Sequence, residues 1–426
     1  MKFNSVGFKR MGQFAAVILI CLAVLGCRQW IEMLTNSRNE NSTAATSLVS
    51  QPDTGASANL LSGDKPSFKF PEVSAEERDY LLSVYRDTWN YIADFVEPST
   101  GLPYDSNKKQ PATSVSNIGL YLGSTAIAYR TGLITREEAL SRINAAFTSL
   151  KKLETWRGFP RVWAAVRSLQ PIHGSDTFSY SKHVANLIGG LTLVQTIFPE
   201  EYNQAVGSYI RGLDFKDMYD AGTGWIKGGY DLKLQDFAVN QPFGPWHYKY
   251  LASESRLISY YLIARGFAPS SHWNSLIRTI QNGDGDWFMV PGLEDGGAYM
   301  PYMAGLYVDE RDMLIGTSQK NYSHSSMTHA ESIGAPVWGW SASLDTRGEY
   351  VPYGQLRDEI VAPYASMLAV NYFPKEVVSN LQALEKMGAR PETEAKRTTD
   401  VWSAFADKRS VFAAPYAFIH KGAVFL

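Results

Sequence analysis

The 426-residue chain carries 40 basic and 42 acidic residues, and a formal net charge of −2 excludes the basic surface that nucleic acids require. Hydrophobic residues make up 45%, enough for a sizeable core, and no change in composition separates two halves, so we expect one large domain. Aromatic residues reach 13%, and side chains such as Trp and Tyr suit a groove that stacks on sugars. An aromatic-rich helical core would explain the same composition equally well.

Residues 1–27 have the pattern of an export signal, in which basic residues precede an apolar run. The run, Phe14–Cys27, has 14 residues, whereas a helix needs roughly 20 to cross a bilayer. Its end, Val24-Leu25-Gly26-Cys27, is similar to a bacterial lipoprotein signal, although Leu25 is bulkier than the usual small residue. We therefore expect cleavage, lipidation of Cys27, and a lipoprotein anchored to a membrane of the cell envelope and facing the periplasm.

Residues 28–70 are rich in Ser, Thr, Asn and Ala and show no sustained apolar period, which predicts a flexible polar linker. Both cysteines, Cys21 and Cys27, lie in the signal, so a mature domain would contain no disulfide bond and would depend on its core for stability.

Residues 71–426 form the predicted domain, and their pattern is helical. Ser74 with Glu77, and Thr135 with Glu138, are predicted capping boxes that mark helix starts. Apolar residues recur at three- and four-residue spacing within 81–92, Ile118–Ile127, Ala139–Leu150, Val184–Ile197, Leu257–Ala264 and Val377–Met387. Three of these segments are followed by the helix-ending glycines Gly132, Gly266 and Gly388. Strand-like alternation is confined to short pieces such as Trp225–Tyr230.

The connections between these helices alternate between short turns and long loops rich in Gly, Pro and aromatic residues. This alternation predicts stacked helical hairpins that close into a double-layered ring. Long loops gathered at one end of such a ring would line a cleft.

Motifs for nucleotide cofactors and for a serine nucleophile are missing from the sequence. It contains no Gly-x-Gly-x-x-Gly and no phosphate-binding Gly-Lys-Ser, and Gly339–Ser343 breaks the Gly-x-Ser-x-Gly pattern. His324 and His329 stand five residues apart, a spacing that does not place two metal ligands on one helical face. We therefore expect neither a cofactor nor a metal.

Carboxylate chemistry remains, and glycoside hydrolysis requires one acid that donates a proton and a second that activates water or attacks. Glu254 lies at the start of the apolar helix that runs to Ala264, where aromatic neighbours such as Tyr250 could favour its protonated form. The structural alternative is a first-turn Glu that stabilises the helix dipole. Asp358 precedes another helix with a buried pattern, and the same two interpretations apply to it.

Four segments resemble successive signatures of the glucoamylase-like domain, which occurs in cyclic β-1,2-glucan synthases and is related to bacterial endo-β-1,2-glucanases. The four are Thr113–Leu122, Tyr250–Gly266 together with His272-Trp273, Gly334–Ser341, and Val361–Ser366. They follow the family order and cover most of residues 80 to 390. The resemblance implies an all-α (α/α)6 toroid with a glucan-binding cleft.

The resemblance also points to Glu254, which matches a glutamate of the second signature, and to Asp358, which matches an aspartate before the Val-x-Pro block. One departure concerns the helix that begins near residue 181, because relatives carry acidic residues just ahead of it and this chain has Lys182-His183. Asp176 is the candidate to replace the missing acid. Without such an acid the fold would bind glycans and not cut them.

The sequence thus predicts an enzyme, an exported glycoside hydrolase that acts on a β-linked glucan, with the β-1,2 linkage favoured. Glu254 is the expected general acid and Asp358 or Asp176 its partner. The expected substrate-binding residues are Trp156, Trp163, Trp246, Trp338, Tyr250 and Arg256.

Two other functions fit the same sequence. One is a non-catalytic glycan-binding lipoprotein that serves polysaccharide assembly or export through the same cleft. The weaker one is an α-helical lyase, which would use His183, Tyr180 and Lys182 on an acidic polysaccharide.

Overall fold

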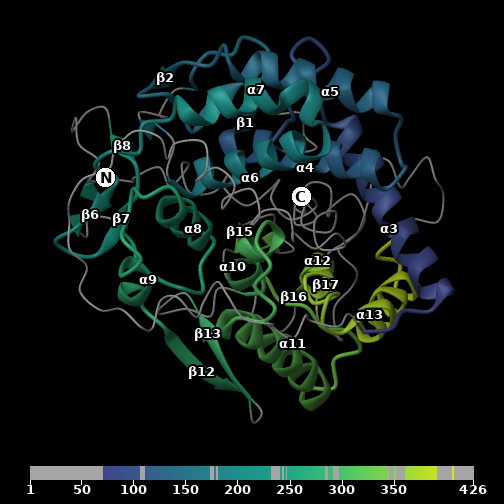
Figure 1. Ribbon diagram of the computed structural model, residues 1–426. Coiled ribbons are helices and arrows are strands. Elements are labelled where there is room, and N and C mark those ends of the chain that lie inside the picture. Colours follow the sequence, from purple (N-terminus) through teal and green to yellow (C-terminus); the bar gives the residue numbers. More distant parts are fainter. Residues whose placement is uncertain are drawn as a thin grey trace, which may run out of the picture.

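The computed structural model describes residues 71–105, 111–172, 177–178, 181–231, 240–241, 244–245, 247–283, 286–290, 297–341, 343–344, 350–351, 360–390 and 405–406. Its helices alternate between an outer and an inner layer of one ring (Figure 1). The outer helices are α3 (Ala75–Asp94), α5 (Arg136–Leu150), α7 (Pro199–Arg211), α9 (His272–Ser275), α11 (Leu314–Ser332) and α13 (Pro374–Lys386). The inner helices are α4 (Val115–Arg130), α6 (Ser181–Ile197), α8 (Arg256–Ala264), α10 (Tyr299–Tyr302) and α12 (Pro363–Met367), and the short 3-10 helix η3 (Met303–Leu306) continues α10.

The predicted all-α toroid is therefore confirmed. Buried apolar side chains of both layers form one large core that runs from Val84 in α3 to Leu384 in α13. None of the helices described is long and apolar enough to cross a membrane.

The predicted helix ends are visible in the structure. Ser74 and Glu77 form the full capping box at the start of α3. Thr135 accepts from the backbone N–H of Glu138 at the start of α5, but the Glu138 carboxylate binds Arg142 within the helix. The glycines that follow α4, α8 and α13 have φ angles of +77°, +74° and +86°, which L side chains rarely adopt: Gly132, Gly266 and Gly388.

Glycines also explain how closely the inner helices α4 and α6 approach each other. A Cβ atom added to Gly190 of α6 would lie 1.7 Å from the carbonyl oxygen of Gly119 in α4. A Cβ added to Gly119 would lie 2.4 Å from the backbone of Asn186 and Leu187. The two helices therefore pack backbone against backbone, and only glycine fits at these two positions.

The strands are short and belong to the loops. Within the described residues, the largest sheet has three strands, β11 (His247–Tyr248), β7 (Trp225–Lys227) and β6 (Tyr219–Asp220). The remaining strands form two-stranded pairs: β1 (Ala112–Ser114) with β4 (Trp163–Ala165), β2 (Thr155–Trp156) with β3 (Phe159–Pro160), β5 (Thr177–Phe178) with β8 (Tyr230–Asp231), β9 (Asn240–Gln241) with β10 (Gly244–Pro245), β12 (Thr279–Gly283) with β13 (Asp286–Val290), β14 (Ser343–Leu344) with β15 (Tyr350–Val351), and β16 (Ile360–Val361) with β17 (Phe405–Ala406). All of these pairs are antiparallel.

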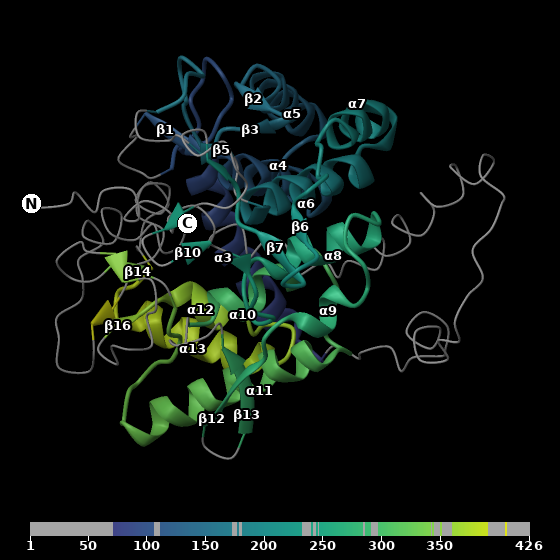
Figure 2. The same cartoon turned by 90° about the vertical axis from the view of Figure 1, so that its left-hand side faces the viewer.

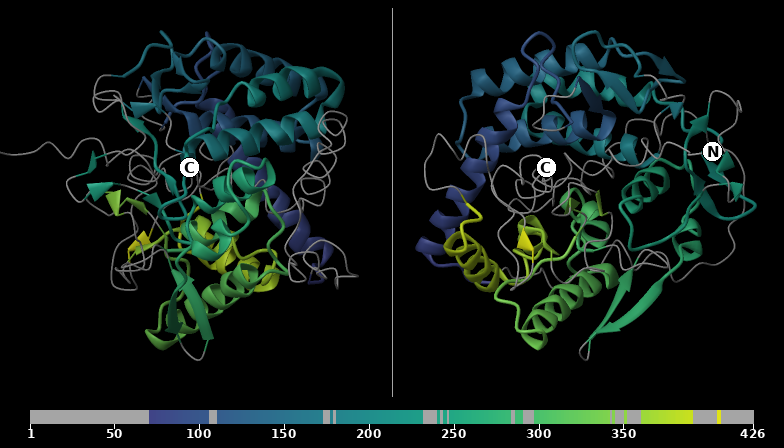
Figure 3. Two further views of the ribbon diagram at one scale, coloured as in Figure 1. Left: turned by 60° about the vertical axis from the view of Figure 1, so that its left-hand side comes forward. Right: turned by 180° about the vertical axis from the view of Figure 1, so that it is seen from behind.

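The ring closes where α13 packs beside α3, as both views in Figure 3 show. A buried ion pair joins the two ends of the ring, because the guanidinium of Arg390 binds the Asp87 carboxylate of α3, with Nε 2.7 Å from Oδ2. Residues 1–70 lie outside the described residues, and so do the predicted signal, the linker and Cys27.

Candidate active site

The inner helices α4, α6 and α12 begin at one end of the ring. The strand β1 leads directly into α4, β5 precedes α6, and β16 precedes α12. These strands lie together with β10 and β14 on the left side of the molecule in Figure 2. Segments far apart in the sequence therefore bring their polar side chains to the same end of the ring.

The starts of α4 and α6 share a buried polar cluster. The Oγ atom of Ser116 lies 2.7 Å from Nδ1 of His183 and accepts a hydrogen bond from the Asn186 amide at 3.3 Å. Next to it, the Asn117 amide donates to the Asp105 carboxylate at 2.9 Å. Because Ser116 Oγ accepts from Asn186, its own hydrogen is available to donate to His183 Nδ1. The cluster occupies the place where the resemblance leads us to expect acidic residues.

Glu254 lies in the turn before α8. The helix begins at Arg256 with Ser255 at the N-cap, so Glu254 precedes the first turn and no acidic residue lies within it. Its side chain is 8% exposed, and Oε2 accepts a hydrogen bond from the Tyr299 hydroxyl at 2.8 Å. Glu254 is therefore not a first-turn glutamate of α8, and its carboxylate binds a side chain of the next inner helix.

Tyr299 itself is held by the segment that precedes α12. Its backbone N–H donates to the Oγ atom of Ser341 at 2.8 Å, and the Tyr364 hydroxyl of α12 donates to the same oxygen at 2.8 Å. The backbone of Trp340 also accepts from Ala298 at 3.0 Å. The starts of α8, α10 and α12 are thus joined through hydrogen bonds around Glu254.

Arg256, a predicted substrate-binding residue, is fully buried. Its guanidinium binds the carboxylate of Glu310, with Nε 2.6 Å from Oε1, and the two side chains are 0% and 1% exposed. In this structure Arg256 contacts the protein and not the solvent. Tyr250, on the other side of Glu254, is half-buried, and its ring faces the ammonium group of Lys249 at 5.5 Å.

The predicted stacking residues occupy three different places. Trp163 is half-buried on β4, where its backbone is the register partner of Ser114, the N-cap residue of α4. Trp156 lies on the β2–β3 hairpin, which the ion pair of Arg157 with Asp214 connects to the end of the outer helix α7. Of these two, only Trp163 is adjacent to the start of an inner helix.

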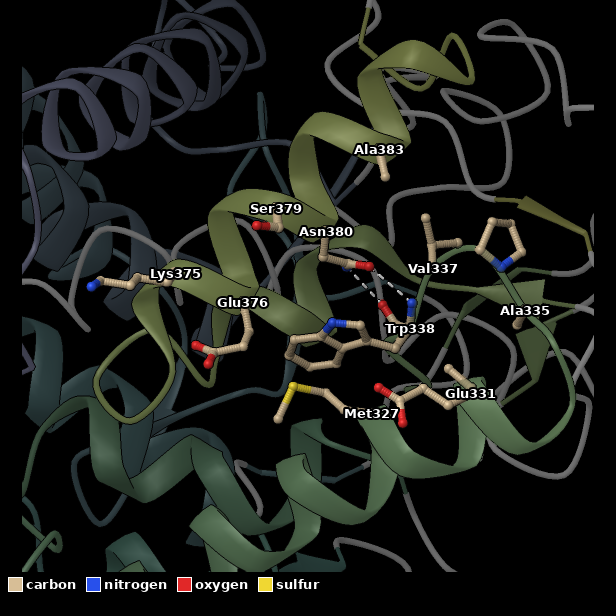
Figure 4. Close-up of a pocket in the computed structure, with 12 residues that line it drawn as sticks. Met327, Glu331, Ala335, Val337, Trp338, Lys375, Glu376, Ser379, Asn380 and Ala383 are labelled. Carbon is tan, nitrogen blue, oxygen red and sulfur yellow. Dashed lines mark hydrogen bonds between the residues drawn. The ribbon is translucent and has the colours of Figure 1, made fainter.

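Trp338 lies in a pocket of about 430 Å³ between the outer helices α11 and α13 (Figure 4). Met327 and Glu331 of α11 and Glu376 of α13 surround its ring. The side chain of Asn380 binds the backbone of Trp338 twice, at 2.9 Å each. The ring is only 8% exposed, so its main contribution is to the packing of the outer layer.

Comparisons with known proteins give relatives by sequence and by structure, and the solved structures show the fold. A family described as a protein of unknown function, DUF3131, matches residues 83–233. Over 74% of its length the chain is 32% identical to the cyclic β-(1,2)-glucan synthase NdvB of Rhizobium meliloti, of which it spans only 16%. The endo-β-1,2-glucanase of Chitinophaga pinensis superimposes with a TM-score of 0.64 and 15% identity, over 83% of this chain and 92% of that one. An endo-β-1,2-glucanase mutant from Talaromyces funiculosus superimposes with a TM-score of 0.54 and 13% identity, over 74% of this chain and 79% of that one.

The chain has the glucoamylase-like (α/α)6 fold. The resemblance stated from the sequence is thereby confirmed. In this glucoamylase-like domain the four signature segments lie at or before the starts of inner helices: Thr113–Leu122 at α4, Tyr250–Gly266 at α8, Gly334–Ser341 beside α10, and Val361–Ser366 at α12.

Several predicted residues lie outside the described part of the glucoamylase-like domain, namely Asp358, Asp176, Trp246 and Tyr180, and the side chain of Lys182 does too. No sequence signal had marked Tyr299 or Asp105, because each follows a loop without periodicity, whereas Ser341 ends the third signature segment. Among the residues described, no group of three or more His, Cys, Asp or Glu side chains is arranged to hold a metal ion, and His324 binds Asp286 at 2.6 Å.

Proposed function

We propose that this protein hydrolyses a β-linked glucan, with β-1,2-glucan as the favoured substrate and Glu254 as the general acid. The observation that carries the proposal is the position of Glu254. This buried carboxylate precedes the inner helix α8, and the Tyr299 hydroxyl at the start of α10 orients it.

In this proposal Glu254 gives its proton to the glycosidic oxygen, and the Tyr299 hydroxyl, which donates to Oε2, orients the carboxyl group. A second carboxylate must activate the water or attack the anomeric carbon, and Asp358 or Asp176 remains the proposed partner. Of Trp156, Trp163 and Trp338, we propose Trp163, beside the start of α4, as the residue that stacks on a sugar.

The named relatives support the choice of substrate. The Chitinophaga pinensis endo-β-1,2-glucanase was determined with sophorotriose and glucose, and a Glu-to-Gln mutant of the Talaromyces funiculosus enzyme with β-1,2-glucan. The synthase NdvB is named for a cyclic β-(1,2)-glucan. An envelope location, with a lipid on Cys27, remains part of the proposal.

Glu254→Gln tests the proposal. The substitution keeps the size and most of the hydrogen bonding of the side chain and removes the acid, so turnover should fall about a hundredfold or more while β-1,2-glucan binding persists. Release of reducing ends from β-1,2-, β-1,3- and β-1,4-glucans measures the activity, and calorimetry measures the binding.

Glu376→Gln is the matched control, because Glu376 is an exposed acid in the first turn of α13. It should lose only about 0.3–1 kcal/mol of stability and keep its activity. If Glu254→Gln cleaves as fast as the parent, Glu254 is not the acid.

The second candidate function is a glycan-binding protein without hydrolysis. The polar cluster of Ser116 and His183 favours it, because it lies where relatives carry acidic residues. A parent protein that binds β-1,2-glucan and cleaves none of the glucans tested would establish this function.

A further inference from the structure

Arg256, two residues after Glu254, is fully buried, and all five of its N–H groups have acceptors. Nε and one Nη2 hydrogen bind Glu310, at 2.6 and 2.8 Å. The second Nη2 hydrogen binds the carbonyl of Pro301 at 2.7 Å. Nη1 binds the carbonyls of Leu251 at 2.6 Å and Ser253 at 3.4 Å. Arg256 therefore has no donor left for a substrate.

Each carboxylate oxygen of Glu310 accepts two hydrogen bonds. Its Oε1 accepts from Arg256 Nε and from the Tyr260 hydroxyl at 2.9 Å. Its Oε2 accepts from Arg256 Nη2 and from the Gln319 amide, each at 2.8 Å. Burial beside this carboxylate also raises the pKa of Tyr260 well above its usual value, so the Tyr260 hydroxyl keeps its proton and remains a donor.

The carbonyls that Arg256 binds belong to the two segments that form the Glu254 site. Leu251 and Ser253 precede Glu254 in the same turn, and Pro301 follows Tyr299 in α10. One guanidinium thus fixes the backbone on both sides of the hydrogen bond between Tyr299 and Glu254.

We propose that Arg256 and Glu310 are positioning residues that set the orientation of Glu254. This inference rests on the proposed function. Burying two charges is costly, and well-packed apolar side chains of similar volume would often give equal stability. A planar guanidinium, in contrast, directs five donors at fixed angles, which neither lysine nor an apolar side chain can do.

Glu310→Gln tests this role, because the amide replaces one acceptor oxygen with an NH₂ group that faces existing donors. We expect kcat on β-1,2-glucan to fall on the order of tenfold or more, since small displacements of a catalytic group have large effects on rate. KM should change less than about twofold. Backbone amides 251–255 and 299–302 should exchange hydrogen faster, measured well below the melting temperature.

Asp87→Asn is the matched control, since it breaks another buried ion pair, that of Asp87 with Arg390. It should lose stability while its kcat and the exchange of amides 251–255 stay at the parent values. Tyr260→Phe removes a single donor to Glu310 and serves as the milder variant if Glu310→Gln does not fold; it should lower kcat in the same direction.

Two results would overturn the positioning role: unchanged exchange of amides 251–255 in the folded variant, or an equal loss of kcat in Asp87→Asn. A parent without hydrolytic activity would refute the proposed function, and the exchange measurement would still decide whether the pair positions Glu254.

Discussion

Glu97 and Glu254 are both buried and each accepts a hydrogen bond from a tyrosine, but their surroundings suit them to different tasks. Glu97 accepts from the Tyr104 hydroxyl at 2.6 Å and from Arg167 at 2.7 Å. Hydrogen bonds from Tyr104, Arg167 and Ser99, in that order of importance, lower the pKa of Glu97 to about 2. A carboxyl group held ionised in this way cannot donate a proton near neutral pH, so Glu97 has a structural role.

Tyr299→Phe should reduce turnover by Glu254 because it removes the hydroxyl that orients the carboxyl group. A hydrogen bond to a carboxylate contributes about 1.5–3 kcal/mol, which corresponds to roughly a tenfold or larger loss of kcat. Initial rates on β-1,2-glucan measure the effect.

The control is Tyr104→Phe, which removes the equivalent bond to Glu97 and should leave kcat unchanged. Equal rates for the parent and Tyr299→Phe would show that this hydroxyl does not orient the acid.

At the scale of helices, the contact between α4 and α6 depends on the absence of side chains at two glycines. In Gly190→Ala the new methyl group would overlap the carbonyl oxygen of Gly119, so the helices must separate. We expect a loss on the order of 3 kcal/mol in the free energy of unfolding, measured in urea.

Gly207→Ala is the matched control in the outer helix α7. There a Cβ would meet only the guanidinium of Arg211, at 3.1 Å, a flexible group that can move. Because alanine favours helix more than glycine does, this variant should be stabilised by about 0.5–1 kcal/mol. A Gly190→Ala variant as stable as the parent would contradict the packing argument.

His272 at the start of α9 connects this helix to α8 and to the turn at Gly224, and it makes the stability of the fold depend on pH. Its Nδ1 lies 2.6 Å from the carbonyl of Gly224 and its Nε2 lies 2.9 Å from the Ser259 hydroxyl of α8. Burial lowers its pKa below the ordinary value of 6.5, against the hydrogen bond to Gly224, which raises it. A neutral ring donates through Nδ1 to the carbonyl and accepts the hydroxyl through Nε2.

The unfolded chain therefore binds a proton at His272 more readily than the folded chain does. The contribution of His272 to the free energy of unfolding should be complete above pH 6.5 and should be lost as the pH falls below that value. Urea unfolding of the parent and of His272→Gln between pH 5 and pH 8 measures this contribution. If the difference in stability between the two proteins is the same at both ends of the range, the prediction is wrong.

The apolar period predicted α3, α4, α5, α6, α8 and α13, but it missed α7, which has 13 residues, and α11, which has 19. For α11 the reason is chemical. The buried face of α11 carries four serines and only two large apolar residues, Ile315 and Tyr322. One of the serines is Ser318, whose hydroxyl accepts from the Met289 backbone at 2.7 Å. A helix that packs through small polar groups gives no hydrophobic signal in the sequence.

The site was predicted only in part, for a similar reason. Glu254 could be marked because it precedes an apolar helix and matches a glutamate of the second signature segment. Tyr299 and Glu310 could not, because their partners lie 45 and 54 residues away in the sequence and loops bring them together. A family resemblance could place Glu254, whereas the side chains that orient it required coordinates.

At the scale of the whole molecule, the ring can close only after nearly all of its helices have been made. The ion pair that joins Arg390 to Asp87 connects residues 303 positions apart, and the chain must have reached Arg390 before α3 can meet its neighbour α13. Closing a loop of that length costs on the order of 5 kcal/mol of chain entropy. During synthesis on a ribosome, the middle helix pairs can form while the first helix still lacks its partner. The nascent domain would therefore expose one side of α3 until almost all of the ring has been translated.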